Sequence, residues 1–253
     1  MNVLSLCSGY GGIELGLQIA TKGAARTICF VEREAYLAVC LATRMQEGNL
    51  RPACIHSDLR TFDGSPWRPA MDRGVLAAGI PCQPFSTADS QYRLTGNHPT
   101  KDDPRRLWSE VLRVLGQVSP AVLFLENVWG IVQADLQEML SDLARVGFDA
   151  EWDVFSAREE GAPHIRERVF VLAHSLREGL EGHREKPSGA SENNSPDLRS
   201  SWWTTEPRMD RVRYGTPYRV DRAIAAGNGV VPAMAARAWH ELLDRAGWEL
   251  DEG

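Results

Sequence analysis

The stretch VLSLCSGYGGIELGL, residues 3–17, decides the fold. It begins with an apolar run typical of a buried strand and ends with apolar residues at helical spacing. Between them, Gly9, Gly11 and Gly12 let the backbone approach a ligand and leave the N-terminus of the helix free to face it. This order predicts the first strand and helix of an α/β sheet, with a ligand at the edge between them.

The same alternation of apolar strands and helical patterns continues along the chain. We expect further strands at 27–32, 53–58, 74–80 and 121–128, and helices at 33–46, 104–118 and 132–146. Two later runs, 149–157 and 168–175, are typical of a pair of strands, which can be antiparallel. The predicted fold class is therefore α/β, with helices on both faces of the sheet.

Length and composition favour one globular domain. The chain has 253 residues, 43% hydrophobic and 25% charged, and it begins without a basic leader and a long apolar region, so we expect a cytoplasmic protein. The cysteines are scattered without metal-ligand spacing, which predicts reduced, mostly buried thiols and neither a disulfide nor a metal site. They are Cys7, Cys29, Cys40, Cys54 and Cys82.

The net charge of −6 does not exclude a nucleic-acid partner, because the charge is unevenly distributed. Residues 60–106 hold 7 Lys and Arg against 5 Asp and Glu, and residues 158–222 hold 12 against 11. These two segments can form a local basic face, and phosphate contacts need no more than that.

Acidic residues follow the second and third predicted strands. Glu32 stands where a carboxylate can accept hydrogen bonds from ribose hydroxyls, and Asp58 where one can accept from an adenine amino group. Glu14 takes the place of the third glycine of the nicotinamide dinucleotide fingerprint, so the pattern favours a nucleoside ligand without a pyrophosphate. The plainer interpretation is a tight turn with solvated acids.

The stretch GIPCQPFSTAD, residues 79–89, places a thiol at the edge where ligands bind in open α/β sheets. Pro81 and Pro84 restrict the backbone around Cys82, and the polar segment 87–103 has the composition of a lid. A nucleophilic thiol needs local positive potential to become a thiolate. A lone cysteine is more often a buried structural residue.

Two further motifs favour a nucleophilic over a structural role for Cys82. Glu126 ends the fifth predicted strand, where desolvation favours a neutral carboxyl group that can protonate a ring nitrogen. His164, Arg166 and Arg168 alternate along HIRERVF, which on a strand puts them on one face, where guanidinium groups can raise the thiolate fraction of a nearby cysteine. An exposed edge strand with Arg–Glu pairs is the alternative.

Taken together, SGYGG, PCQPFS, ENV, HIRER and GNGVVP, in this order along the chain, resemble the DNA cytosine-5 methyltransferase family in the compact form of phages and bacterial chromosomes. The resemblance implies a Rossmann-like methyltransferase sheet, S-adenosylmethionine as cofactor, and a cytosine flipped out of duplex DNA. It implies that Cys82 attacks carbon 6, Glu126 engages nitrogen 3, and Arg166 and Arg168 complete the catalytic set.

The resemblance also implies three regions and their contacts. We expect a catalytic and cofactor-binding domain at 1–175, a short irregular target-recognition region at 176–213, and a C-terminal segment at 214–253 that folds back beside the first strand. The cofactor would contact Cys7, Gly9, Tyr10, Gly11, Gly12, Glu32, Arg33, Asp58, Leu59, Pro81, Leu107, Asn228 and Val230. DNA would contact Ser86, Gln91, Arg93, Arg199, Trp202, Trp203, Arg208, Arg211 and Arg213.

The chain departs from the family pattern at three positions. Cys7 replaces a phenylalanine and offers less apolar surface to adenine, Ser5 replaces an aspartate, and His164 replaces a glutamine and adds pH dependence. We expect a monomer without an obligate protein partner, either accompanied by a restriction enzyme or protecting phage DNA. The alternatives are a transfer-RNA methyltransferase, disfavoured because the recognition region has no Cys-Phe-Thr tripeptide, and a non-catalytic DNA- or cofactor-binding relative.

Overall fold

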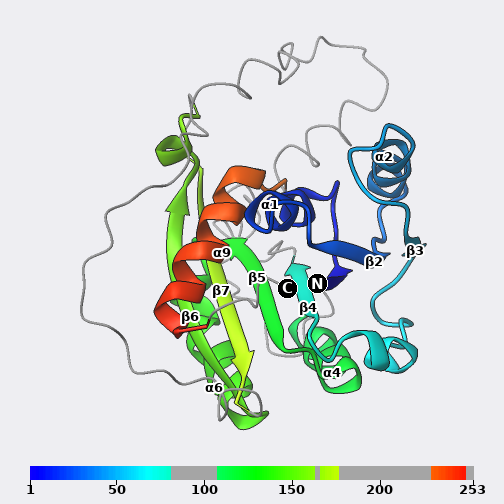
Figure 1. The fold of residues 1–253 in the computed structure, drawn as a ribbon. Helices are drawn as coiled ribbons and strands as arrows, with labels where there is room; N and C mark the ends of the chain where they lie inside the picture. The colour runs from blue at the N-terminus through cyan, green and yellow to red at the C-terminus, as the bar shows by residue number, and fades with distance from the viewer. Residues whose placement is uncertain (81–106, 163–165, 177–228, 249–253) are drawn as a thin grey trace, which may run out of the picture.

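The computed structural model describes residues 1–80, 107–162, 166–176 and 229–248. In these residues a mixed sheet has the strand order β3-β2-β1-β4-β5-β7-β6 (Figure 1). The strands are β1 (Asn2–Leu6), β2 (Arg26–Val31), β3 (Cys54–His56), β4 (Val75–Gly79), β5 (Val122–Val128), β6 (Phe148–Ser156) and β7 (Glu167–Ser175). Neighbouring strands from β3 to β5 are parallel, whereas β7 is antiparallel to both β5 and β6. The α/β class and the antiparallel late pair are confirmed.

Helices cover both faces of this sheet. One core contains buried side chains of α4 (Trp108–Val118), α5 (Ile131–Ala134) and α6 (Leu136–Arg145). The opposite core contains those of α1 (Gly12–Ala20) and α9 (Pro232–Ala246), while α2 (Ala35–Gln46) packs on Phe30 of β2. Strand residues alternate between the two cores, as Val3 and Leu4 do, because successive side chains on a strand point to opposite faces.

The strand order reverses at β1. From β1 the chain crosses through α1 to β2 on one side, and β4 pairs with β1 on the other. At such a point two crossovers leave in opposite directions, and the crevice beyond the carboxyl ends of the strands is where ligands bind in open α/β sheets. The glycine loop after β1 lies at this point.

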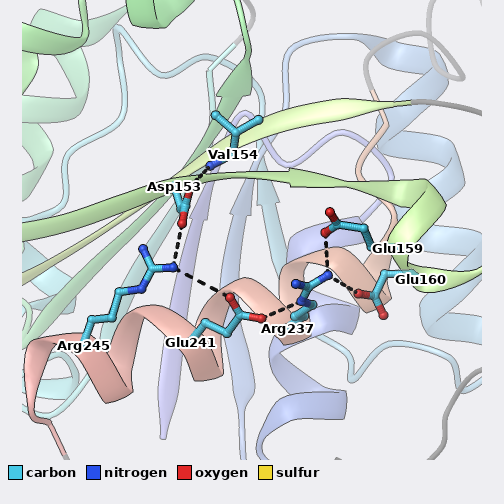
Figure 2. A network of polar contacts seen from close by, with 7 residues as sticks. All are labelled: Asp153, Val154, Glu159, Glu160, Arg237, Glu241 and Arg245. Atoms are coloured by element: carbon cyan, nitrogen blue, oxygen red, sulfur yellow. Dashed lines mark hydrogen bonds and ion pairs between the residues drawn. The ribbon is translucent and has the colours of Figure 1, made fainter.

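The C-terminal helix α9 returns to the first βα unit, as predicted, and packs along α1 (Figure 1). A Cβ atom at Gly16 would lie 2.5 Å from the Cβ atom of Ala235, so glycine at this position permits the close approach of the two helices. Charged side chains hold the other side of α9 (Figure 2). Arg237 pairs with Glu159 at 2.6 Å, and Arg245 pairs with Asp153 of β6 at 2.6 Å.

Several details differ from the sequence-based expectation. The helix expected at 132–146 is divided into α5 and α6, because Asp135 leaves the helical conformation with a φ of −129°. A 3-10 helix, η1 (Ser65–Ala70), was not expected, and a second, η3 (Ala157–Glu160), follows β6. The expectation that most cysteines are buried is wrong for the four that are described, since Cys29 is buried but Cys54 is exposed and Cys7 and Cys40 are half-buried.

Some expectations fall on residues outside the described ranges. The segment 87–103, the recognition region after residue 176 and its expected irregular lobe belong to this group. In the described part of the chain, no helix has the length and apolar character needed to span a membrane.

Candidate functional site

The glycine loop connects β1 to α1 through a left-handed backbone. Gly9 has a φ of 57° and Gly11, which caps α1, a φ of 86°, a region that glycine enters at little cost. No atom of the described residues lies within 4 Å of where a Cβ atom at Gly9 would be. The loop therefore turns tightly while its outer side, in the described structure, is open to a ligand.

Glu32 lies directly after β2 and holds this loop. Its carboxylate accepts hydrogen bonds from the Gly9 amide at 2.7 Å and from the Glu34 amide at 2.8 Å. The side chain is buried, and the pKa of Glu32 is raised by that burial even though the two amides favour the charged form. An acceptor group is thus fixed at the edge shared by β1 and β2, beside the open side of the loop.

Cys7 occupies the first position after β1 in a strained conformation, with a φ of 51°. Burial, and then the negative charges of Glu32 and Asp58, raise the pKa of the Cys7 thiol to about 12. Cys7 therefore remains a neutral thiol at physiological pH and presents a small apolar surface next to two carboxylates.

Asp58 and Leu59 follow β3 in a loop whose backbone is hydrogen-bonded to side chains of α4. Arg113 donates to the Leu59 carbonyl oxygen at 2.7 Å and to the Phe62 carbonyl oxygen at 2.9 Å. Gln117, one turn further along α4, accepts from the Gly64 amide at 2.9 Å. These hydrogen bonds fix the backbone next to Asp58, whose own carboxylate accepts from the Arg60 amide at 3.0 Å.

A buried polar chain lies beneath the glycine loop. The Ser5 hydroxyl bonds the carboxyl group of Glu14 on α1 and, at 2.7 Å, the hydroxyl of Ser8. Ser8 Oγ in turn accepts from the Val31 amide of β2 at 3.2 Å. Glu14 is only 2% exposed, and burial raises its pKa to about 7. The chain joins α1, β1 and β2 at the point where the loop leaves the sheet.

The C-terminal segment completes this side of the site. A Cβ atom at Gly12 would lie 2.5 Å from the Val230 carbonyl oxygen, and a Cβ atom at Gly229 would overlap the ring of Tyr10. The guanidinium carbon of Arg44 lies 5.2 Å from the centre of the Tyr10 ring. Residues from both ends of the chain therefore meet at the loop.

Glu126 lies near the end of β5, beside β4. It pairs in register with Gly79, and a Cβ atom at Gly79 would lie 3.8 Å from Glu126 Oε2 and 3.4 Å from the Cys7 carbonyl oxygen. The carboxyl ends of β1, β4 and β5 therefore converge here. The described range ends at Ile80, and the segment that contains Cys82 follows it in the sequence.

Two arginines act on the Glu126 carboxyl group, one by direct contact and one through its charge. Arg168 Nε lies 2.8 Å from Glu126 Oε1, and both side chains are largely buried. Arg166, just before β7, donates to the Gly229 carbonyl oxygen. Burial raises the pKa of Glu126 to about 7, and the positive charges of Arg168 and Arg166 oppose that rise. The raised pKa allows the carboxyl group to give up or accept a proton near neutral pH.

The structure brings together many of the residues singled out in the sequence. Those at the carboxyl edge of the sheet are Cys7, Gly9, Tyr10, Gly11, Gly12, Glu32, Asp58, Glu126, Arg166, Arg168 and Val230. Arg33 is exposed after β2, Leu59 is buried, and Leu107 caps α4. Pro81, Cys82, His164, Asn228 and all the expected DNA contacts lie outside the described residues: Ser86, Gln91, Arg93, Arg199, Trp202, Trp203, Arg208, Arg211 and Arg213.

Sequence reasoning missed three contributors to the site. Arg113 gave no local signal, because its role depends on residues more than 50 positions away in the chain, and Gly229 was noticed only as part of the GNGVVP motif, without its contact with Tyr10. Glu14 was noticed only as a departure from a glycine pattern. A buried acid at a core-facing position of an amphipathic helix is a signal that could have identified it.

Comparisons with known proteins agree with this arrangement. The model of the C-5 cytosine-specific DNA methylase family matches residues 1–214. The type II methyltransferase M.NgoMIV of Neisseria gonorrhoeae is 29% identical over 174 residues, which are 67% of this chain and 50% of that protein. M.NaeI of Lentzea aerocolonigenes is 28% identical over 254 residues, 96% of this chain and 58% of that protein. The chain thus spans 50% and 58% of these two relatives.

Solved structures share the fold. The Dnmt2 methyltransferase of S. pombe superposes with a TM-score of 0.53 at 22% identity, covering 74% of this chain and 57% of that chain. The methyltransferase EhMeth of Entamoeba histolytica gives a TM-score of 0.51 at 17% identity, covering 69% and 52%. Since the family model matches most of the residues, including the glycine loop, Glu126 and Arg168, the chain belongs to the C-5 cytosine-specific DNA methylase family.

Proposed function

We propose that this protein transfers a methyl group from S-adenosylmethionine to carbon 5 of a cytosine flipped out of duplex DNA, through a covalent adduct with Cys82. The observation that carries the proposal is the buried Glu126 carboxyl group, paired with Arg168 at 2.8 Å and adjacent to the strand from which the Cys82 segment continues. A proton donor and a cation next to a cysteine segment are what addition to a pyrimidine ring requires.

The loop residues fit S-adenosylmethionine. The ligand has ribose hydroxyls and an amino-substituted ring but no pyrophosphate, so it needs carboxylate acceptors at the strand ends and does not need the fingerprint glycine that Glu14 replaces. Glu32 and Asp58 supply those acceptors at adjacent strand ends, and the outer side of Gly9 is open in the described structure. When bound, the cofactor supplies an electrophilic methyl group.

The chain's own residues perform the remaining chemistry. The Cys82 thiolate adds to carbon 6 of the cytosine while Glu126 delivers its proton to nitrogen 3, which makes carbon 5 nucleophilic. Arg168 holds the ring carbonyl and steadies Glu126 through their ion pair. Carbon 5 then takes the methyl group that the bound cofactor would supply. Loss of the carbon 5 proton to solvent, departure of the Cys82 thiolate and return of the nitrogen 3 proton to Glu126 restore the aromatic ring and the free enzyme.

The partner that we propose is duplex DNA. The charged side chains of the segments 60–106 and 158–222 and the aromatic pair Trp202 and Trp203 would supply phosphate and base contacts. The region 176–213 would read the target sequence, and the protein would act as a cytoplasmic monomer.

Methyl transfer from tritiated S-adenosylmethionine to unmethylated duplex DNA tests this proposal. We expect the wild type and Cys40→Ala, which removes a half-buried thiol on α2, to label DNA, and Cys82→Ala to leave it unlabelled. Sequencing should map the label to carbon 5 of cytosine in one short context. Label in transfer RNA in place of DNA, or binding of cofactor and DNA without any transfer by the wild type, would contradict the proposal.

A further inference from the structure

Tyr10 and Gly229 fit together as one joint between the cofactor loop and the C-terminal segment. We propose that Tyr10 is a positioning residue for catalysis: its ring fixes the backbone at Gly229, and the Gly229 carbonyl oxygen fixes Arg166 beside Glu126. This inference rests on the proposed function, because it assigns Arg166 and Glu126 to the reaction.

The packing at the joint leaves no room for a side chain at position 229. A Cβ atom there would overlap the Tyr10 hydroxyl and lie 2.6 Å from Tyr10 Cε1. The Tyr10 ring therefore leaves room only for glycine at this position.

The joint continues directly to the catalytic carboxyl group. Arg166 donates a hydrogen bond to the Gly229 carbonyl oxygen, and its charge acts on both Tyr10 and Glu126. Arg166 is thus held by the C-terminal segment, whereas Arg168 is held by Glu126 itself at 2.8 Å. A shift of Gly229 would move Arg166 and leave the Arg168 pair in place.

The Tyr10 ring has a second contact, with α2. The Arg44 guanidinium carbon lies 5.2 Å from the centre of the ring, a distance typical of a cation–π contact. The ring therefore contacts both α2 and the C-terminal segment, and a displacement by an added methyl group would disturb the Arg44 contact. Val230, the next residue, is also closely packed, since a Cβ atom at Gly12 would lie 2.5 Å from the Val230 carbonyl oxygen.

A double-mutant cycle of Gly229→Ala and Tyr10→Ala tests the joint, and Tyr10→Ala alone should also slow single-turnover methyl transfer because it removes the ring that positions Gly229. Gly229→Ala should slow single-turnover methyl transfer at saturating cofactor and DNA on the order of 100-fold, as small displacements of catalytic groups do. Adding Tyr10→Ala, which removes the overlapping ring, should recover about tenfold or more of that loss. Adding Tyr10→Phe should recover much less, since Cε1 stays 2.6 Å from the new Cβ atom. The matched control is Gly116→Ala in α4, where a Cβ atom meets nothing within 4 Å, and its rate should equal that of the wild type.

Thermal unfolding and S-adenosylhomocysteine affinity are measured for each variant. If Gly229→Ala fails to fold, the proposal predicts that the double variant with Tyr10→Ala folds. A double variant that also fails to fold would overturn the proposal. An unchanged rate at saturation with only weaker cofactor binding would also overturn it, since the joint would then serve the cofactor alone. A wild type that transfers no methyl group refutes the proposed function. In that case the Tyr10–Gly229 contact is still tested by whether the effects of the two substitutions on the unfolding temperature are non-additive.

Discussion

Replacing Glu14 with glutamine removes a buried titrating group from beneath the glycine loop while keeping an oxygen that can accept from Ser5. The pKa of Glu14 in the folded protein is about 7, compared with an ordinary value of 4.5. Because the folded pKa is raised, the stabilising contribution of the protonated group is complete below pH 4.5 and is lost as the pH rises through 7. Each pKa unit corresponds to about 1.4 kcal/mol, so the loss approaches about 3 kcal/mol.

Urea unfolding at several pH values between 4.5 and 8 measures this effect. The free energy of unfolding of the wild type should fall relative to that of Glu14→Gln by about 3 kcal/mol across the range. Glu126 titrates over the same range in both proteins, so its contribution cancels in the difference. Glu47→Gln, an exposed change of the same charge, is the control. Parallel pH curves for the wild type and Glu14→Gln would refute the reasoning.

Three further predictions concern the helices and the Glu126 carboxyl group. Gly16→Ala should destabilise the fold by about 1–3 kcal/mol in urea, because its Cβ atom would lie 2.5 Å from an atom of α9, and a stability equal to that of Gly116→Ala would contradict this. Arg113→Ala should weaken S-adenosylhomocysteine binding about tenfold, as measured by calorimetry, because the loop next to Asp58 loses charge-assisted hydrogen bonds from α4. An unchanged affinity would show that these hydrogen bonds do not affect ligand binding. The single-turnover rate should decline above a pH of about 7 as Glu126 loses its proton, and the same decline in Glu126→Gln would assign it to another group.

The order of strands and helices could be predicted because the spacing of apolar residues along the sequence indicates which side chains are buried. The alternation around 3–17 and the two late apolar runs identified the β1–α1 unit and the β6–β7 pair. The acids at the strand ends could be placed at one edge because parallel strands share their carboxyl end. Glu32 and Glu126 indeed lie there, after β2 and near the end of β5.

The remaining features depend on contacts between distant residues. The overlap of Gly229 with Tyr10, the hold of Arg113 on Leu59 and the burial of Glu14 have no periodic signature. The 3-10 helix η1 was missed because SPWRPA contains two prolines and no helical apolar period. Such features are set by tertiary packing, which a local pattern does not record.

The most direct test of the proposed reaction is mass spectrometry of the protein after incubation with S-adenosylmethionine and duplex DNA containing 5-fluorocytosine. Fluorine at carbon 5 cannot leave as a proton does, so the thiolate adduct should accumulate. We expect a DNA adduct on Cys82 in the wild type and in Cys40→Ala, no adduct in Cys82→Ala, and slower formation in Glu126→Gln. An adduct that forms on another cysteine, or methylation of normal cytosine by Cys82→Ala, would contradict the mechanism.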